Sequence, residues 1–214
     1  MNALEFLLAK GGADLSTRSP IEIPGVDRGT LARWFAELGY TSGVEIGVEQ
    51  GQYSRVLCKS NSGLKLYSVD PWKVYDGFMD PRTQEQLDTL YLDAVKRLSP
   101  YTAKIMRMTS VEAARKFTDN SLDFVYIDGN HTLPFVIQDL VAWYPKIKPG
   151  GIISGHDYYK SPRPHTDQHV CFAVNAYVDA YRIRPWFLLG RKNAPAGELR
   201  DRQRSWCFVK PLVV

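Results

Sequence analysis

Apolar residues occur along the chain in short runs that alternate with segments of helical periodicity. The runs are continuous instead of alternating with polar residues, which is typical of parallel strands buried on both faces. They predict strands at 43–48, 64–69, 103–107, 122–127 and 151–155. Helical patterns precede or separate them at 27–39, 52–60, 83–98, 109–117 and 133–145. This alternation indicates an α/β fold with a doubly wound, Rossmann-like, mostly parallel sheet.

The end of the chain follows a different pattern. A helix predicted at 168–182 is followed by two strands, 185–189 and 205–210, with no helical pattern between them. We therefore expect an antiparallel C-terminal strand pair, with 205–210 running antiparallel beside 151–155. Residues 1–26 are expected to be an N-terminal lead-in, irregular from residue 11, and residues 27–214 a single domain.

The stretch from Ser42 to Ser54 combines an apolar strand, a glycine turn and the start of a helix. A second strand ends in one acid, Asp70, 19 residues after Gly51. Glycines let a backbone approach a ligand, and such an acid accepts hydrogen bonds from two ribose hydroxyls. The order Glu45-x-Gly47-x-x-x-Gly51 differs from the dinucleotide fingerprint, and Glu49 would repel a phosphate. S-adenosylmethionine, which has no phosphate and a cationic amino-acid tail, suits this turn better.

On these residues the chain resembles the class I S-adenosylmethionine-dependent methyltransferases. The segments 121–131 and 140–157 are similar to the fourth and fifth strands of that family. Within it, they resemble most closely the metal-dependent sugar O-methyltransferases of the macrolide-tailoring type. The resemblance covers roughly residues 27 to 210 and implies the antiparallel ending described above. It also implies a methyl donor, S-adenosyl-L-methionine, and a small-molecule acceptor.

The cofactor residues are assigned by their place relative to the glycine turn and the next strands. The acid and first glycine of the turn lie at the methionine end, and the following helix N-terminus can bind the methionine carboxylate. Asp70 binds the ribose, and Trp72 covers the adenine, lines the acceptor site or simply packs. The family resemblance places adenine contacts after the strand at 103–107. The cofactor-binding residues expected are Glu45, Gly47, Gly51, Tyr53, Ser54, Asp70, Trp72, Thr109, Ser110 and Asp128.

Two further strand ends carry side chains suited to activating a hydroxyl group. A hydroxyl is a poor nucleophile at neutral pH, and either a divalent metal or a general base can remove its proton. Asp128 and Asp157 offer hard oxygen ligands, and His131 has an intrinsic pKa suited to a base. The family resemblance implies the same division, with Asp128 and Asp157 as metal ligands and His131 as the catalytic base.

His156 departs from the family pattern, which has an acid at this position. An imidazole is a poor ligand for Mg²⁺ and a good one for Mn²⁺, so either metal remains open. His156 is therefore a candidate metal ligand or a structural hydrogen-bonding residue. Two aromatic loop-like segments, 71–81 with Tyr75 and Phe78, and 158–168, are expected to cover the acceptor site.

The composition bears on the cellular location of the protein and on the class of its partners. The three cysteines are odd in number and lie in apolar surroundings, which predicts reduced core thiols and a cytoplasmic protein. No apolar run is long enough to span a membrane. The net charge is +4, and seven basic residues lie between Arg182 and Arg204. Because aromatic residues do not interleave with them, we expect a solvated hairpin loop there and disfavour nucleic acid as a partner.

Several functional alternatives remain open at this point. One is a metal-independent N- or RNA methyltransferase that uses the basic 182–204 segment, and another is a non-catalytic S-adenosylmethionine-binding protein. A nicotinamide-dependent oxidoreductase is disfavoured by Glu49 and by the antiparallel ending. The sequence is also compatible with a homo-oligomer.

Overall fold

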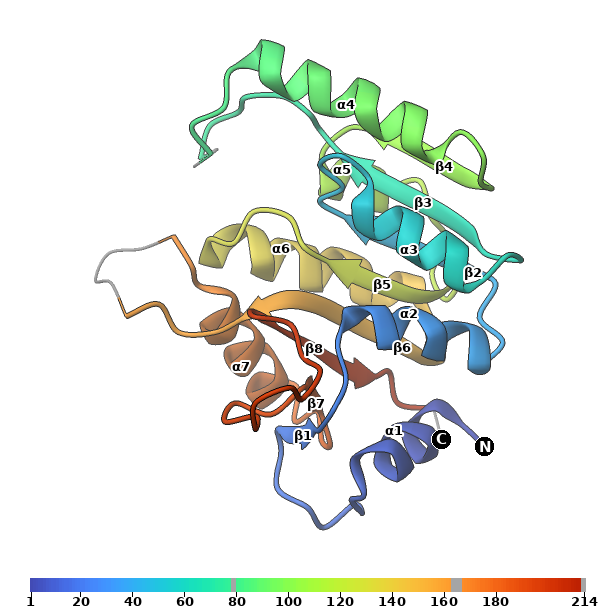
Figure 1. The fold of residues 1–214 in the computed structure, drawn as a ribbon, viewed down its shortest axis with the longest axis vertical. Helices are drawn as coiled ribbons and strands as arrows, with labels where there is room; N and C mark the ends of the chain where they lie inside the picture. Colours follow the sequence, from blue (N-terminus) through green and yellow to red (C-terminus); the bar gives the residue numbers. More distant parts are fainter. Residues whose placement is uncertain (78–79, 163–166, 213–214) are drawn as a thin grey trace.

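The described chain, residues 1–77, 80–162 and 167–212 of a computed structural model, forms one mixed sheet with helices on both faces (Figure 1). The sheet has eight strands. In spatial order they are β1 (Ile21–Ile23), β7 (Phe187–Leu189), β8 (Arg204–Val209), β6 (Ile147–Tyr158), β5 (Leu122–Ile127), β2 (Ser42–Ile46), β3 (Lys65–Asp70) and β4 (Ala103–Arg107). The predicted parallel arrangement of β2, β3, β5 and β6 is confirmed. β8 runs antiparallel to both β6 and β7, as predicted.

Helices cover the sheet in two layers. In chain order they are α1 (Ala3–Gly11), α2 (Arg28–Glu37), α3 (Gln52–Ser60), α4 (Gln84–Leu98), α5 (Ser110–Ala114), α6 (Leu133–Trp143), the short 3₁₀ helix η1 (Tyr144–Lys146) and α7 (Val170–Ala180). Buried residues of α1, α2 and α3 pack on one face with Phe124 and Tyr126. Those of α5, α6 and α7 pack on the other with Val125 and Ile127. Alternate residues of β5 therefore serve opposite layers, which explains its continuous apolar run.

The helix ends follow from local sequence. Asp27 caps α2 by accepting a hydrogen bond from the Thr30 amide, and Thr83 and Thr109 form capping boxes at α4 and α5. Among the helices of the described chain, none combines the length and apolar character that crossing a membrane requires. The three cysteines are buried and form no disulfide, as predicted.

The N-terminal segment differs from the prediction. Residues 21–23, expected to be irregular, form the edge strand β1, which pairs in parallel with β7. Residues 3–11 form α1, whose start has a capping box between Asn2 and Glu5. Three residues between prolines carry too little local signal to predict a strand, because their stability comes from the distant partner β7. β6 also extends beyond the predicted 151–155, through Tyr158.

Candidate active site

The site lies where the order of the strands reverses in the sheet. β2 has β3 on one side and β5 on the other, and both neighbours are parallel to it. Such a switch point opens a crevice at the carboxyl ends of the strands. A cavity of about 1030 Å³ lies there. Its wall includes His131 and eight of the predicted cofactor-binding residues, namely Glu45, Gly47, Tyr53, Asp70, Trp72, Thr109, Ser110 and Asp128.

The glycine turn passes close to the end of β5. Gly47 has φ of 83°, and a Cβ at this position would lie 2.1 Å from the Asp128 carbonyl oxygen, so no other residue fits. Asp70 closes the turn from the other side. Its Oδ2 accepts hydrogen bonds from the Val48 amide (3.0 Å) and the Glu49 amide (3.1 Å). Burial raises the pKa of Asp70, although these amide hydrogen bonds oppose the rise.

Glu45 lies inside β2 and is buried. The Ser54 hydroxyl donates a hydrogen bond to its Oε2 and lies 2.8 Å from the Ser68 hydroxyl oxygen. Burial raises the pKa of Glu45 to about 8, against the hydrogen bond from Ser54. Glu45 therefore keeps its proton near neutral pH, and in this structure it joins β2 to the start of α3. Ser54 and Gly51 do not line the cavity, and Gly51 instead packs against α4.

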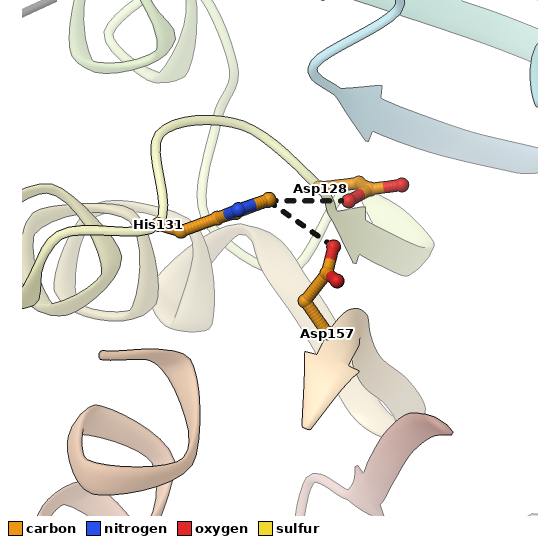
Figure 2. A group of neighbouring side chains, drawn as sticks. All are labelled: Asp128, His131 and Asp157. Carbon is orange, nitrogen blue, oxygen red and sulfur yellow. Dashed lines mark ion pairs between the residues drawn. The ribbon is translucent and has the colours of Figure 1, made fainter. Parts of the chain in front are cut away.

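Figure 2 shows Asp128, His131 and Asp157 pointing toward one another from the ends of β5 and β6 and from the loop before α6. His131 Nε2 lies 3.6 Å from Asp128 Oδ1 and 3.2 Å from Asp157 Oδ2. His156 Nδ1 lies 3.1 Å from the same Asp157 oxygen and 3.8 Å from Asp128 Oδ1. The side chain of His131 is 36% exposed and that of His156 only 11%. His131 therefore faces the cavity, while His156 and Asp157 do not line it.

The charges of this cluster depend on one another. Burial alone would lower the pKa of His131, but the hydrogen bond to Asp128 and the charges of Asp157 and Asp128 raise it. The same opposition raises the pKa of His156, with Asp157 as its hydrogen-bond partner. Burial would raise the pKa of Asp157, but the hydrogen bond from His156 and the two imidazolium charges hold it low. Asp157 is therefore ionised at neutral pH.

Asp157 reaches the cluster because β6 is irregular at this point. The pairing of β6 with β8 shifts register between Gly155 and Tyr158, and Asp157 has φ of 57°. A bulge of this kind turns a side chain out of its regular direction and is common beside active sites. The local sequence gives no sign of it, because the shift depends on the pairing with β8.

Three polar side chains near the cavity, those of Arg28, Asp139 and Asp201, were not predicted from the sequence. Arg28, the first residue of α2, has its Nη1 3.6 Å from Asp128 Oδ2, and its amide donates to Asp201 Oδ2 (2.8 Å). Asp201 comes from the loop between β7 and β8. Asp139 of α6 lines the cavity, and burial raises its pKa to about 7 against a hydrogen bond from Ser110. The sequence did contain a signal for Asp139, because an acid among the apolar positions of a predicted helix indicates a buried carboxyl group.

Other predicted residues are held by the fold. The indole of Trp72 is buried, donates a hydrogen bond to the Glu49 carbonyl (2.8 Å) and packs against Leu87 and Ala94. The Ser110 hydroxyl accepts a hydrogen bond from the Trp143 indole (2.8 Å). Tyr75 of the predicted lid lines the cavity, whereas Phe78 lies outside the described residues. The predicted hairpin loop between β7 and β8 is confirmed.

The donor atoms of the cluster fit a divalent cation. One ligand atom each from Asp128, His131 and Asp157 lie within 4.8 Å of one another. Ligands around one octahedral ion are about 3 Å apart, given metal–oxygen distances near 2.1 Å. The Asp128 and Asp157 carboxylates supply hard oxygen ligands of the kind that Mg²⁺ and Mn²⁺ bind, and His131 lies beside them.

Comparisons with known proteins bear on the fold and the family. The profile of the family described as "Methyltransferase domain" matches residues 44–158. "Uncharacterized protein y4gI" of Sinorhizobium fredii is 25% identical over 122 residues, which are 53% of this chain but only 13% of that protein.

Solved structures share the fold at low identity. A proposed caffeoyl-CoA O-methyltransferase from Staphylococcus aureus is 12% identical with a TM-score of 0.59, covering 96% of this chain and 90% of that one. The O-methyltransferase TomG from Streptomyces achromogenes, solved with S-adenosylmethionine, is 14% identical with a TM-score of 0.57, covering 95% and 86%. The N-methyltransferase NodS from Bradyrhizobium japonicum is 14% identical with a TM-score of 0.54, covering 86% and 95%.

Both O- and N-methyltransferases thus share this fold, so the likeness alone does not identify the acceptor atom. The family match includes the glycine turn, Asp70, Asp128 and Asp157, which are the residues that define the crevice and the acid–histidine cluster. The chain therefore belongs to the methyltransferase-domain family.

Proposed function

We propose that this methyltransferase transfers the methyl group of S-adenosylmethionine to a hydroxyl of a small acceptor such as a sugar or natural product, with the help of a divalent cation. The observation that carries the proposal is the convergence of two carboxylates and His131, of which Asp128 and His131 line the cavity. An acceptor nitrogen with a free lone pair needs no such cluster, whereas a hydroxyl must lose its proton.

In this proposal His131 is the general base. Its Nε2 takes the proton of the acceptor hydroxyl, and the resulting oxygen attacks the methyl carbon in line with the leaving sulfur. The sulfonium becomes the thioether of S-adenosylhomocysteine, and the proton stays on His131. Asp128 and Asp157 stabilise the imidazolium, because their carboxylate oxygens lie 3.6 and 3.2 Å from Nε2.

Asp128 and Asp157 would hold the cation, whose chemistry is to lower the pKa of a bound hydroxyl and orient it. Arg28 contacts the other oxygen of Asp128 and so fixes the direction of Oδ1. For His156 we propose that it holds Asp157 in place through the 3.1 Å contact of Nδ1. Its direct ligation of the metal remains a prediction from the sequence.

The proposed cofactor contacts are Glu45 and Gly47 at the methionine end and Asp70 at the ribose. Asp70 Oδ1 accepts one protein hydrogen bond, from the Trp72 amide, so it can accept another from a ribose hydroxyl. Thr109 and Ser110 follow β4 on the same cavity wall and are proposed to contact the adenine. Asp139, which is hydrogen-bonded to Ser110, adds a hydrogen-bond acceptor beside Thr109 and Ser110.

The test separates cofactor, cation and base. S-adenosylhomocysteine binding is measured by calorimetry, Mn²⁺ binding by electron paramagnetic resonance, and turnover as S-adenosylhomocysteine release over a panel of sugar and phenolic acceptors. EDTA and Asp157→Asn should abolish Mn²⁺ binding and turnover and leave S-adenosylhomocysteine affinity within about twofold. His131→Ala should keep Mn²⁺ binding and lose about 10²–10⁴ in rate. Asp179→Asn, on the exposed end of α7, is the matched control.

Two results would contradict the proposal. Turnover that survives EDTA and Asp157→Asn would leave the cation without a role. Methylation restricted to amine acceptors would exclude the hydroxyl chemistry while leaving the family assignment intact.

A further inference from the structure

A second cavity, of about 590 Å³, adjoins the first and shares Arg28, Gln52 and Tyr53 with it. Its remaining charged wall consists of Arg55 and Lys59 on α3 and Arg97 near the end of α4. We call the surface formed by Arg28, Arg55, Lys59 and Arg97 the basic groove. No carboxylate is among the described residues that line it.

Most of the charge in the basic groove is not neutralised by the fold. Arg28 is the exception, since it contacts Asp128 and Asp201. Arg97 donates a hydrogen bond to the Gln50 carbonyl, and within residues 1–77, 80–162 and 167–212 it forms no ion pair. In the same part of the chain, Arg55 and Lys59 form none either, and both side chains are exposed.

The two cations on α3 repel each other. Arg55 and Lys59 are four residues apart, so they lie on the same face of α3 and repel each other by a few tenths of a kcal/mol. Arg97 of α4 lines the same groove, which adds a third like charge. Lys59 and Arg97 lie in the last turns of their helices, where a single cation is favourable, but the repulsion among the three cations remains. An anionic ligand would offset that repulsion.

We infer that the basic groove binds a phosphate group carried by the methyl acceptor, an inference that rests on the proposed methyl transfer at Asp128 and His131. Arg28 connects the two places, because its guanidinium lies 3.6 Å from Asp128 and also lines the groove. An acceptor could thus present its hydroxyl to His131 and its phosphate to Arg55, Lys59 and Arg97.

The chemistry of the groove favours a small phosphate ester. A guanidinium group can donate two parallel hydrogen bonds to the oxygens of one phosphate, and a lysine ammonium adds a compact positive charge. The volume falls in the range of small-molecule sites. The one aromatic residue among its described lining, Tyr53, is buried and hydrogen-bonded to the Arg28 carbonyl, so the groove lacks the stacking surface that single-stranded RNA uses.

The experiment uses inorganic pyrophosphate as the probe, in buffer free of divalent metal, with calorimetry on the whole chain. The double variant Arg55→Gln with Lys59→Gln removes two of the unpaired cations. The matched control is Lys96→Gln, an exposed cation of α4 beside Arg97 that does not line the groove. We expect the double variant to lose tenfold or more in pyrophosphate affinity, about the loss of one charge-assisted hydrogen bond. Lys96→Gln should bind like the wild type.

S-adenosylhomocysteine binding, measured on the same samples, reports folding and separates the two claims. If all proteins bind S-adenosylhomocysteine normally and the wild type does not bind pyrophosphate, the inference about the groove is wrong and the proposed function stands. Equal pyrophosphate affinity of the wild type and the double variant would also overturn the inference about the groove and leave the proposed function standing. The groove would instead be assigned to nucleic acid if the wild type bound a ten-nucleotide RNA but not pyrophosphate, and the double variant did not bind that RNA. Failure of the wild type to bind S-adenosylhomocysteine overturns the proposed function.

Discussion

Replacing Glu45 by Gln should change how the stability of the protein depends on pH. Burial raises the pKa of Glu45 from 4.5 to about 8, so the folded protein binds this proton more tightly than the unfolded chain does. The free energy of unfolding therefore falls as pH rises from about 4.5 to 8. Above that range the contribution of Glu45 no longer changes with pH. At about 1.36 kcal/mol per pKa unit, the shift corresponds to a loss of up to about 5 kcal/mol.

Gln keeps the oxygen that accepts the hydrogen bond from Ser54 and cannot ionise. The Glu45→Gln protein should thus be close to the wild type at pH 5 and more stable by several kcal/mol at pH 9. Urea denaturation of the cofactor-free protein, followed by tryptophan fluorescence at pH 5 to 9, measures this difference. Other titrating groups are common to both proteins and cancel. An equal loss of stability in both proteins would refute the buried, neutral Glu45 described here.

The other predictions concern the cofactor, the base and the turn. Asp70→Ala should weaken S-adenosylhomocysteine binding tenfold or more, because a ribose hydrogen bond to a carboxylate is worth about 1.5–3 kcal/mol; unchanged affinity in calorimetry would contradict the ribose assignment. Turnover should rise with pH through a midpoint above 6.5, since His131 must be neutral to accept a proton and its neighbours raise its pKa; a flat rate profile from pH 5 to 8 would speak against this base. Gly47→Ala should destabilise the protein by about 1–3 kcal/mol more than Gly197→Ala, because both glycines have φ near 84° but only Gly47 would clash with the Asp128 carbonyl; equal unfolding midpoints in urea would contradict that contact.

The core of the site could be predicted because it depends on sheet geometry alone. Asp70 and Asp128 follow continuous apolar runs, and the carboxyl ends of parallel strands meet at one edge. Their proximity needs no knowledge of distant contacts. The same reasoning placed Asp157 nearby, although it could not give the bulge that aims the carboxylate.

What could not be predicted comes from residues far apart in the chain. Arg28 and Asp201 are 173 positions apart, and their contact depends on the pairing of the edge strand β1 with β7. Trp72 was ambiguous because a tryptophan after a strand can cover a ligand or fill a core. Its burial against Leu87 and Ala94 depends on where α4 lies, which local sequence does not specify.

The position of Arg28 has a consequence for any shortened form of this chain. The region that matches the family, residues 44–158, supplies the glycine turn and the acid–histidine cluster, whereas Arg28 and Asp201 lie on either side of it in the chain. The charges around Asp128 are therefore set from both flanks. A fragment cut to the matched region would keep the acids and His131 but lose the cation that contacts Asp128 and the acid that holds this cation.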